Sequence, residues 1–316
     1  METPRKVQVT GRNTFIVSLP REWVEKRNIS RGDPIYLAEK SDGTISISTK
    51  QEKKELKKYV IHVTEDRATV IRNIISAYIG GAGKIVLKGK QVNTVAETIR
   101  RILSGVEIIN ENEEEIELGV QSFDNLDIDG VLRREFNVTK SMFSLVSQVC
   151  NGDEDAITEI TKKEQEVDRL FILLLRDLVI SGRSQKENIF RAIVAKSIEK
   201  IGDHLVDLSK NAANAGINPW LAEMIHSAGE TYYAAFETFA ISDLDEGKYR
   251  SAKAKYLENY KKVNNLLKKE KDQTKMFIFL LLLEKCNKIV RYSEDIIESN
   301  TDIIFTNMSG EDNDGK

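Results

Sequence analysis

The chain is poor in the residues that cross-link a polypeptide or interrupt its helices. It has two cysteines, four prolines and three histidines among 316 residues. Cys150 and Cys286 lie far apart within apolar stretches, which implies no disulfide framework and fits a reducing, cytoplasmic setting. The longest apolar run, Met276 to Leu283, is too short to span a bilayer. No apolar run follows the first six residues, so we expect no secretory signal and a protein that is not embedded in a membrane.

Net charge is also scarce. The chain has 47 lysines and arginines against 50 acidic residues, a formal charge of −3, so the protein as a whole gives no reason to expect nucleic-acid binding. The charge is uneven, because residues 1–31 carry seven basic and three acidic side chains, a local charge of +4. The basic side chains are Arg5, Lys6, Arg12, Arg21, Lys26, Arg27 and Arg31.

Residues 5–48 have the pattern of a small β-rich unit, in which apolar and polar residues alternate between turn signals. The predicted strands cover residues 6–10, 14–19, 34–39 and 44–48. A short helix is predicted over residues 21–26, with Pro20 at its first position. Four short strands and one helical turn bury little apolar surface in a single copy, so we expect this unit to pair with a second copy.

After a charged linker over residues 50–58, the pattern changes to that of a small α/β module with helices on one face of its sheet. Predicted strands cover residues 59–63, 84–87, 106–110 and 116–120, and predicted helices cover residues 66–77 and 94–103. The glycine-rich residues 80–83 follow a helix and precede a strand, whereas a phosphate loop runs from a strand into a helix. We therefore interpret these glycines as a helix stop.

From residue 124 onward the sequence predicts helices almost to the end. They cover residues 128–150, 153–181, 185–214, 218–243, 246–270 and 273–305. Six long helices joined by short turns indicate antiparallel neighbours in helical bundles. Residues 307–316 are polar and contain two glycines, so we expect a disordered tail.

Two acid pairs stand out in the helical region: Glu164 with Asp168, and Glu199 with Asp203. The spacing i, i+4 places both carboxylates of a pair on one helix face, one turn apart. Carboxylates this close repel each other, and a hard cation with oxygen ligands would relieve the repulsion. The alternative is a solvated charged face, paired with nearby lysines. Those lysines are Lys162, Lys163 and Lys200.

The helical region repeats internally, as two units of three helices over residues 124–215 and 216–306. In this alignment the apolar positions persist, but the four acids do not. They align with Tyr260, Asn264, Asn287 and Arg291. The concentration of acids in one unit makes a cation site as well supported as a solvated charged face.

The two acid motifs and their apolar frame resemble the PhoU, or phosphate-uptake regulator, family over residues 124–305. The resemblance implies two tandem three-helix bundles, iron or zinc clusters held by Glu/Asp-x-x-x-Asp motifs, and restraint of phosphate uptake through a sensor kinase or transporter. The candidate metal ligands are Glu164, Asp168, Glu199 and Asp203; the resemblance implies iron or zinc, and a hard cation such as magnesium also suits carboxylate ligands. His204 is a weaker candidate, because its side chain points about 100° away from that of Asp203 on a helix.

The N-terminal unit resembles the AbrB/SpoVT swapped-hairpin family through Gly11-Arg12, Leu19-Pro20-Arg21-Glu22 and Gly32-Asp33. The resemblance implies that two subunits exchange hairpins to form a DNA-binding dimer, with a local charge of about +8 for phosphate contacts. The candidate DNA-binding residues are Arg5, Lys6, Arg12, Asn13, Arg21 and Arg27. Two other roles stay open: the basic residues only solubilise the hairpin, or the unit acts as a dimerisation or antitoxin-type module.

We therefore predict a mainly α protein with a small β-rich N-terminal domain. The predicted parts are an AbrB-like unit (1–50), an α/β module (59–122), two PhoU-like three-helix bundles (124–215 and 216–306) and a tail (307–316). The combination resembles archaeal phosphate-uptake regulators. The expected function is that of a homodimeric regulator that binds promoter DNA of phosphate-transport genes. The alternative is an adaptor that docks on a phosphate transporter or sensor kinase without binding DNA. We expect no enzyme, because no nucleophile constellation is visible.

Overall fold

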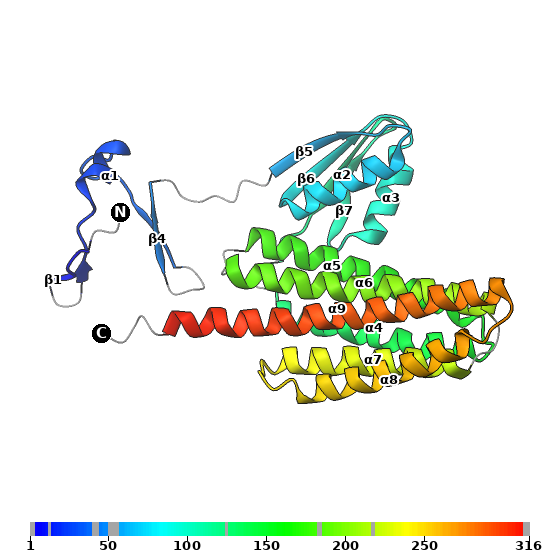
Figure 1. Ribbon diagram of the computed structural model, residues 1–316. Helices are drawn as coiled ribbons and strands as arrows, with labels where there is room; N and C mark the ends of the chain where they lie inside the picture. The colour runs from blue at the N-terminus through cyan, green and yellow to red at the C-terminus, as the bar shows by residue number, and fades with distance from the viewer. Residues whose placement is uncertain are drawn as a thin grey trace. The chain divides into compact units, whose positions relative to one another are not determined.

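The computed structural model describes residues 4–11, 14–39, 44–49, 57–123, 126–181, 185–215 and 219–311. The chain divides into two compact units, Met1–Glu55 and Leu56–Lys316 (Figure 1). The first is small and rich in β-strands, and the second contains an α/β module followed by long helices. This mainly helical architecture with a small β-rich N-terminal region confirms the predicted fold class.

The first unit consists of two antiparallel hairpins and one short helix. Its elements are β1 (Gln8–Thr10), β2 (Thr14–Ile16), α1 (Arg21–Lys26), β3 (Tyr36–Glu39) and β4 (Ile45–Ser48). Val9 faces Phe15 across the first hairpin, and Leu37 faces Ile47 across the second. The strands are shorter than predicted. Pro20 is the N-cap of α1 rather than its first helical residue, since its ψ of 130° is extended.

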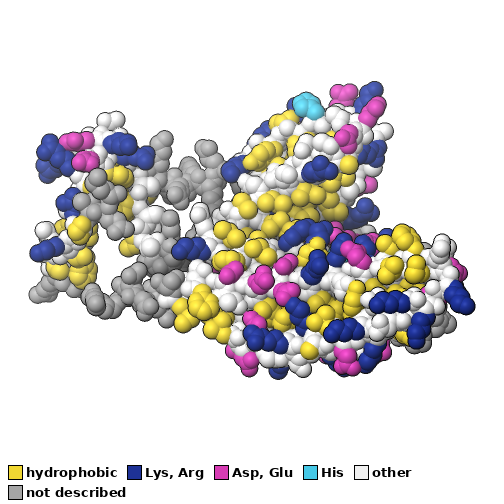
Figure 2. All heavy atoms as spheres, in the orientation of Figure 1, with side chains coloured by type: hydrophobic (Ala, Val, Ile, Leu, Met, Phe, Trp, Pro, Cys, Tyr) yellow, Lys and Arg dark blue, Asp and Glu magenta, His cyan; other side chains and the backbone are white. Residues whose placement is uncertain are grey.

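Apolar side chains of the first unit lie on its surface. Among its described residues none is buried, and the exposed fraction reaches 62% for Val9, 73% for Phe15 and 67% for Leu37. Figure 2 shows hydrophobic side chains of this unit next to lysine and arginine side chains. A single copy thus leaves uncovered the apolar surface whose burial stabilises small domains.

The second unit begins with a four-stranded sheet in the order β5-β6-β8-β7, in which only β5 and β6 are parallel. Its elements are β5 (Lys57–His62), α2 (Arg67–Ile79), β6 (Ala82–Lys88), α3 (Val92–Ile102), β7 (Val106–Glu111) and β8 (Glu115–Val120). As predicted, α2 and α3 pack on the sheet in one shared core. The linker prediction was wrong for Lys57 and Lys58, which pair with β6.

Six long helices follow, close to their predicted bounds. They are α4 (Ile128–Cys150), α5 (Ala156–Ile180), α6 (Gln185–Ala215), α7 (Pro219–Ala240), α8 (Gly247–Leu267) and α9 (Gln273–Glu311). The tail prediction was wrong for residues 307–311, which extend α9, because no proline stops the helix after residue 305. One hydrophobic core runs through all six helices, so their grouping into two bundles stays a prediction. Among the described residues, no helix combines the length and apolar character needed to cross a membrane.

A buried arginine joins the α/β module to α5. The Arg176 side chain, only 4% exposed, donates hydrogen bonds to the carbonyl oxygens of Tyr78 and Ala82, the latter at 2.9 Å. Its guanidinium carbon lies 4.6 Å from the centroid of the Tyr78 ring. Tyr78 lies in the last turn of α2, where the helix dipole favours a positive charge, and Ala82 is the first residue of β6. Arg176 therefore fixes the position of the module on the helical region.

Replacing Arg176 with methionine keeps much of the side-chain volume but leaves the two carbonyls without their charged donor. We expect Arg176→Met to lower the free energy of unfolding by roughly 2–3 kcal/mol, the range for hydrogen bonds to charged groups. Urea titration followed by circular dichroism measures the change. Arg169→Met, at an exposed position of the same helix, is the control and should change it little. Equal effects of the two variants would contradict the role of Arg176.

Candidate metal centre

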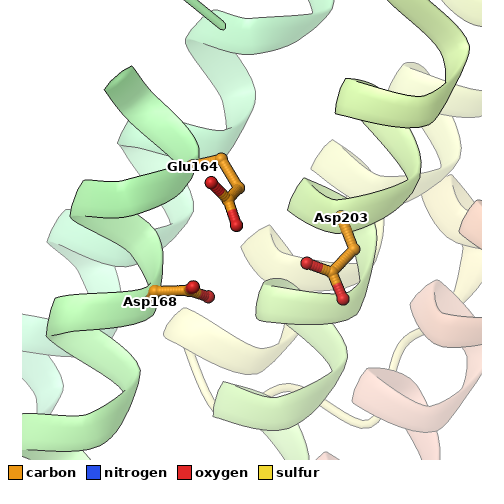
Figure 3. A group of neighbouring side chains, drawn as sticks. All are labelled: Glu164, Asp168 and Asp203. Atoms are coloured by element: carbon orange, nitrogen blue, oxygen red, sulfur yellow. The ribbon is translucent and has the colours of Figure 1, made fainter. Parts of the chain in front are cut away.

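Helices α5 and α6 pack side by side and bring three of the predicted acids together. Glu164 and Asp168 project from α5, and Asp203 projects from α6 towards them (Figure 3). One oxygen from each carboxylate lies within 4.8 Å of the others, and all three residues are partly buried. We call Glu164, Asp168 and Asp203 the acid cluster. A cation between the helices would find carboxylate ligands from both.

The fourth predicted ligand, Glu199, lies beside the acid cluster but pairs with lysines. Its Oε2 is 2.8 Å from Nζ of Lys196 and 3.4 Å from Nζ of Lys200. Lys200 also lies 2.6 Å from Oδ2 of Asp203. Part of the negative charge is thus offset by lysines on α6, as the alternative of a charged face requires. Glu164 and Asp168 have no such neighbour on α5, since Lys163 contacts Glu159 instead.

The pKa values of Asp168 and Glu164 are raised, because lysines do not offset the whole negative charge of the acid cluster. Burial raises the pKa of Asp168 to about 7, and the carboxylates of Glu164, Glu199 and Asp203 add to this effect. The pKa of Glu164 is raised mainly by burial, although a hydrogen bond with Asp168 opposes the shift. Without a cation, Asp168 is therefore protonated in part of the molecules near neutral pH. A donor set of crowded carboxylates with uncompensated charge fits a hard metal ion.

A further acid, Glu135 on α4, was not predicted as a site residue. It is fully buried, and neither carboxylate oxygen has a hydrogen-bond partner among the described residues. Its pKa lies well above the usual range because of burial and then of the charges of Glu199 and Asp168, while Lys196 opposes them. The signal in the sequence was a glutamate within the apolar face formed by Leu132 and Phe136.

Buried hydroxyl groups surround Glu135 on the inner side. Thr139 on α4 and Tyr232 on α7 are both completely buried, and their hydroxyls lack hydrogen-bond partners in the described part of the chain. Burial raises the pKa of Tyr232 well above its usual value, and the nearby Glu135 carboxylate raises it further. The helical core therefore contains buried polar groups of α4 and α7 near the acids of α5 and α6. This buried polarity destabilises the helical core unless it is compensated.

His204 follows the acid cluster in sequence but not in space. Its ring stacks against Tyr292 of α9, with ring centroids 5.7 Å apart, and it does not join the group of Glu164, Asp168 and Asp203. Burial lowers the pKa of His204, and the charges of Lys285 and Lys288 lower it further. The imidazole is therefore oriented towards the second half of the helical region.

At three of the four positions where the first half has acids, the second half has the neutral side chains Tyr260, Asn264 and Asn287, and at the fourth it has the exposed Arg291. Asn287, which aligns with Glu199, accepts a hydrogen bond from the Tyr256 hydroxyl at 2.7 Å. Tyr260, which aligns with Glu164, lies next to Tyr256, with ring centroids 6.4 Å apart. These contacts stabilise the helix pair without a cation.

The predicted DNA-binding residues belong to the first unit. Arg5, Lys6, Arg21 and Arg27 are exposed. The Arg21 side chain is 90% exposed and its Nε donates to Glu25 at 2.7 Å, a weak surface pair. Arg12 and Asn13 lie outside the described residues.

Comparison with protein families gives two matches. Residues 132–212, which span most of α4 to α6 and all the acids above, match the model of the PhoU domain. Residues 8–55 match the model described as antidote-toxin recognition MazE, bacterial antitoxin. No curated protein matches the chain. The two matches confirm the suspected architecture of an AbrB/MazE-like unit followed by a PhoU-like helical region.

The unpaired carboxylate of Glu135 predicts an unusual pH dependence. Because its pKa is raised on folding, its contribution to stability is complete below the pKa of an unfolded glutamate, about 4.3, and is lost as the pH rises towards the folded pKa. Glu135→Gln mimics the protonated acid. In metal-free protein we expect equal free energies of unfolding near pH 4, and a variant more stable by roughly 1–3 kcal/mol near pH 8.

Urea titrations of both proteins across this pH range, in the presence of a chelator, measure the difference. Glu154→Gln removes an exposed carboxylate and is the matched control. A Glu135→Gln variant that loses stability at pH 8 would show that the carboxylate has a stabilising partner.

Proposed function

We propose that the protein is a homodimeric, DNA-binding regulator of phosphate-transport genes, in which the PhoU-like helices hold a metal ion. The PhoU match supports a role in phosphate-transport regulation. The MazE match supports nucleic-acid or protein binding by the first unit. Both matched domains are regulatory, and we propose no catalytic activity. The protein acts in the cytoplasm, where promoter DNA and the inner face of a transporter or sensor kinase are accessible.

The observation that carries this proposal is the exposed apolar surface of the first unit. Val9 and Phe15 on one hairpin, and Leu37 and Ile47 on the other, are paired across strands yet exposed. A second copy would cover them, because identical hairpins present complementary strand edges and apolar faces. Pairing would also double the local charge to about +8 and so provide an electrostatic surface for phosphates.

The metal ion would be held by Glu164, Asp168 and Asp203, with Glu199 joining them if it releases its lysine partners. Such a set of oxygen ligands suits magnesium or iron better than zinc, which usually takes cysteine or histidine. A bound cation would offset the repulsion between the helices and stabilise the packing of α5 on α6. Metal occupancy would thereby connect the cell's metal or phosphate status to the regulator.

The MazE match favours a second candidate function. The description of the matched family refers to toxin recognition by an antitoxin, so we infer that a unit of this kind also binds proteins. In this case the first unit would dimerise or hold a protein partner, and the helices would dock on a phosphate transporter or sensor kinase without DNA.

The arginines of the first unit distinguish the two functions. Arg12→Ala with Arg21→Ala removes four positive charges from a dimer. If these arginines contact phosphates, we expect the variant to bind promoter fragments more weakly. The slope of the logarithm of the binding constant against the logarithm of the salt concentration should become less negative by roughly 3 to 4. Fluorescence anisotropy with fragments enriched from genomic DNA measures both quantities.

Arg133→Ala with Arg169→Ala removes the same charge from exposed positions on α4 and α5 and serves as the control. Analytical ultracentrifugation tests whether each variant keeps the oligomeric state of the parent. Unchanged DNA affinity in the Arg12, Arg21 variant, or no DNA binding by the parent, would support the adaptor function instead.

The acid cluster is tested by its metal content. We expect the parent to retain metal after dialysis. The metal content of the Asp168→Asn, Asp203→Asn variant should be lower by at least about tenfold, since even loss of a group that only hydrogen-bonds to a ligand weakens metal binding by that factor. Elemental analysis by mass spectrometry measures the content. In chelator the same variant should be more stable than the parent, because it lacks two of the repelling carboxylates. Glu284→Gln with Asp302→Asn is the control, and equal metal in all three proteins would refute the site.

A further inference from the structure

The most basic part of the chain lies far from the DNA-binding candidates in sequence. Residues 248–275, which form α8 and its connection to α9, contain ten basic and three acidic side chains, a local charge of +7 in a chain of net charge −3. Neither the acid cluster nor the first unit accounts for this excess. It is larger than the +4 of residues 1–31.

Most of these lysines have no acidic partner. Four of the ten basic side chains are paired: Lys262 with Glu258 at 2.8 Å, Arg250 with Glu246 at 3.1 Å, Lys248 with Glu237 at 3.6 Å, and Lys253 with Glu294. Six others are exposed, and their ammonium groups form no ion pair or hydrogen bond within the described part of the chain. They are Lys255, Lys261, Lys268, Lys269, Lys271 and Lys275. Unpaired lysines at this density repel one another unless an anionic partner is present.

Exposed apolar side chains accompany the lysines. At the start of α9, Phe277, Leu280 and Leu281 are 62%, 45% and 39% exposed and follow the spacing i, i+3, i+4 of one helix face. The opposite face is buried in the helical core through Phe279, Leu282 and Leu283. Leu266, near the end of α8, is 54% exposed. Figure 2 shows hydrophobic and basic side chains next to one another where α8 turns into α9.

We infer that this basic tip, formed by Lys261, Lys268, Lys269, Lys271 and Lys275 with Leu266, Phe277, Leu280 and Leu281, binds the surface of an anionic lipid membrane. Lysine ammonium groups are attracted to acidic headgroups, and exposed apolar side chains enter the boundary between headgroups and acyl chains. The combination of both is what distinguishes a membrane-binding surface from a merely soluble basic helix. The binding is peripheral, because no described helix can cross the bilayer.

Two other anionic partners fit the surface less well. A nucleic acid would engage the lysines, but its phosphate backbone offers nothing to Phe277, Leu280 and Leu281. An acidic amphipathic helix needs an apolar groove between helices, whereas these three side chains point outward from one helix, opposite its buried face. A flat surface of anionic lipid accommodates both the charge and the outward apolar face.

The test is co-sedimentation of the full chain with vesicles. We expect binding to vesicles of phosphatidylcholine mixed with phosphatidylglycerol to exceed binding to pure phosphatidylcholine by at least about tenfold, and to weaken with salt. Each lysine at an anionic surface strengthens binding by about fivefold, so replacing several with glutamine should lower the affinity by at least about tenfold. The lysine variant is Lys261→Gln, Lys268→Gln, Lys269→Gln and Lys271→Gln.

A second variant, Phe277→Gln with Leu280→Gln and Leu281→Gln, keeps the charge. Its affinity for the anionic vesicles should also fall by at least about tenfold. Its melting temperature should match the parent's, because the replaced side chains are exposed. The matched control is Arg12→Ala with Arg21→Ala, which should keep vesicle binding even if it loses DNA binding. This inference is therefore separable from the proposed function.

Three results would overturn the inference. One is equal binding to both kinds of vesicle, and another is unchanged binding by the lysine and apolar variants. The third is loss of vesicle binding in the Arg12, Arg21 control alone, which would assign the lipid contact to the first unit. Loss of DNA binding by the lysine variant, with no vesicle binding by the parent, would identify the tip as a nucleic-acid surface.

Discussion

The crowding of carboxylates between α5 and α6 constrains the packing of the helical region. Helices pack because they bury apolar faces, and here the faces of α5 and α6 also bring Glu164, Asp168 and Asp203 within reach of one another. In a partly dry environment these charges are more costly than in water. Two features of the structure reduce this repulsion: lysines pair with Glu199 and Asp203, and the pKa values of Glu164 and Asp168 are raised. A bound cation would reduce the repulsion without protonation of the carboxylates.

The two halves of the helical region handle the same packing problem differently. In the second half Asn287, which aligns with Glu199, accepts a hydrogen bond from Tyr256, so a neutral hydrogen bond joins α8 and α9 at this position. The first half keeps acids, including the fully buried Glu135, at the expense of stability. Proteins retain such unfavourable groups mainly where they have a role. The asymmetry is therefore consistent with a packing half and a binding half in one core.

Much of this fold could be predicted from the sequence, because helices have strong periodic signals. The bounds of α4 and α6 agree within one residue, and the i, i+4 spacing placed Glu164 and Asp168 on one face of α5. The packing of α5 on α6 adds Asp203 to them. Glu135 was missed because a single acid in an apolar stripe has no spacing pattern of its own. Glu199 was expected among the other acids, but spacing on a helix does not reveal that Lys196 and Lys200 compete for it. The strands of the first unit are shorter than predicted and those of the α/β module are longer, since pairing partners rather than composition determine where a strand ends.

Helix α5 carries both the acid cluster and the arginine that holds the α/β module. Asp168 and Arg176 are eight residues apart, which corresponds to about 12 Å along a helix axis. A helix of this length is stiff, so a rotation or translation of α5 displaces both groups together. Arg176 has two carbonyl partners whose directions are set by the end of α2, and it tolerates little sliding. A displacement of α5 at the acid cluster would consequently move the α/β module as well, through Arg176.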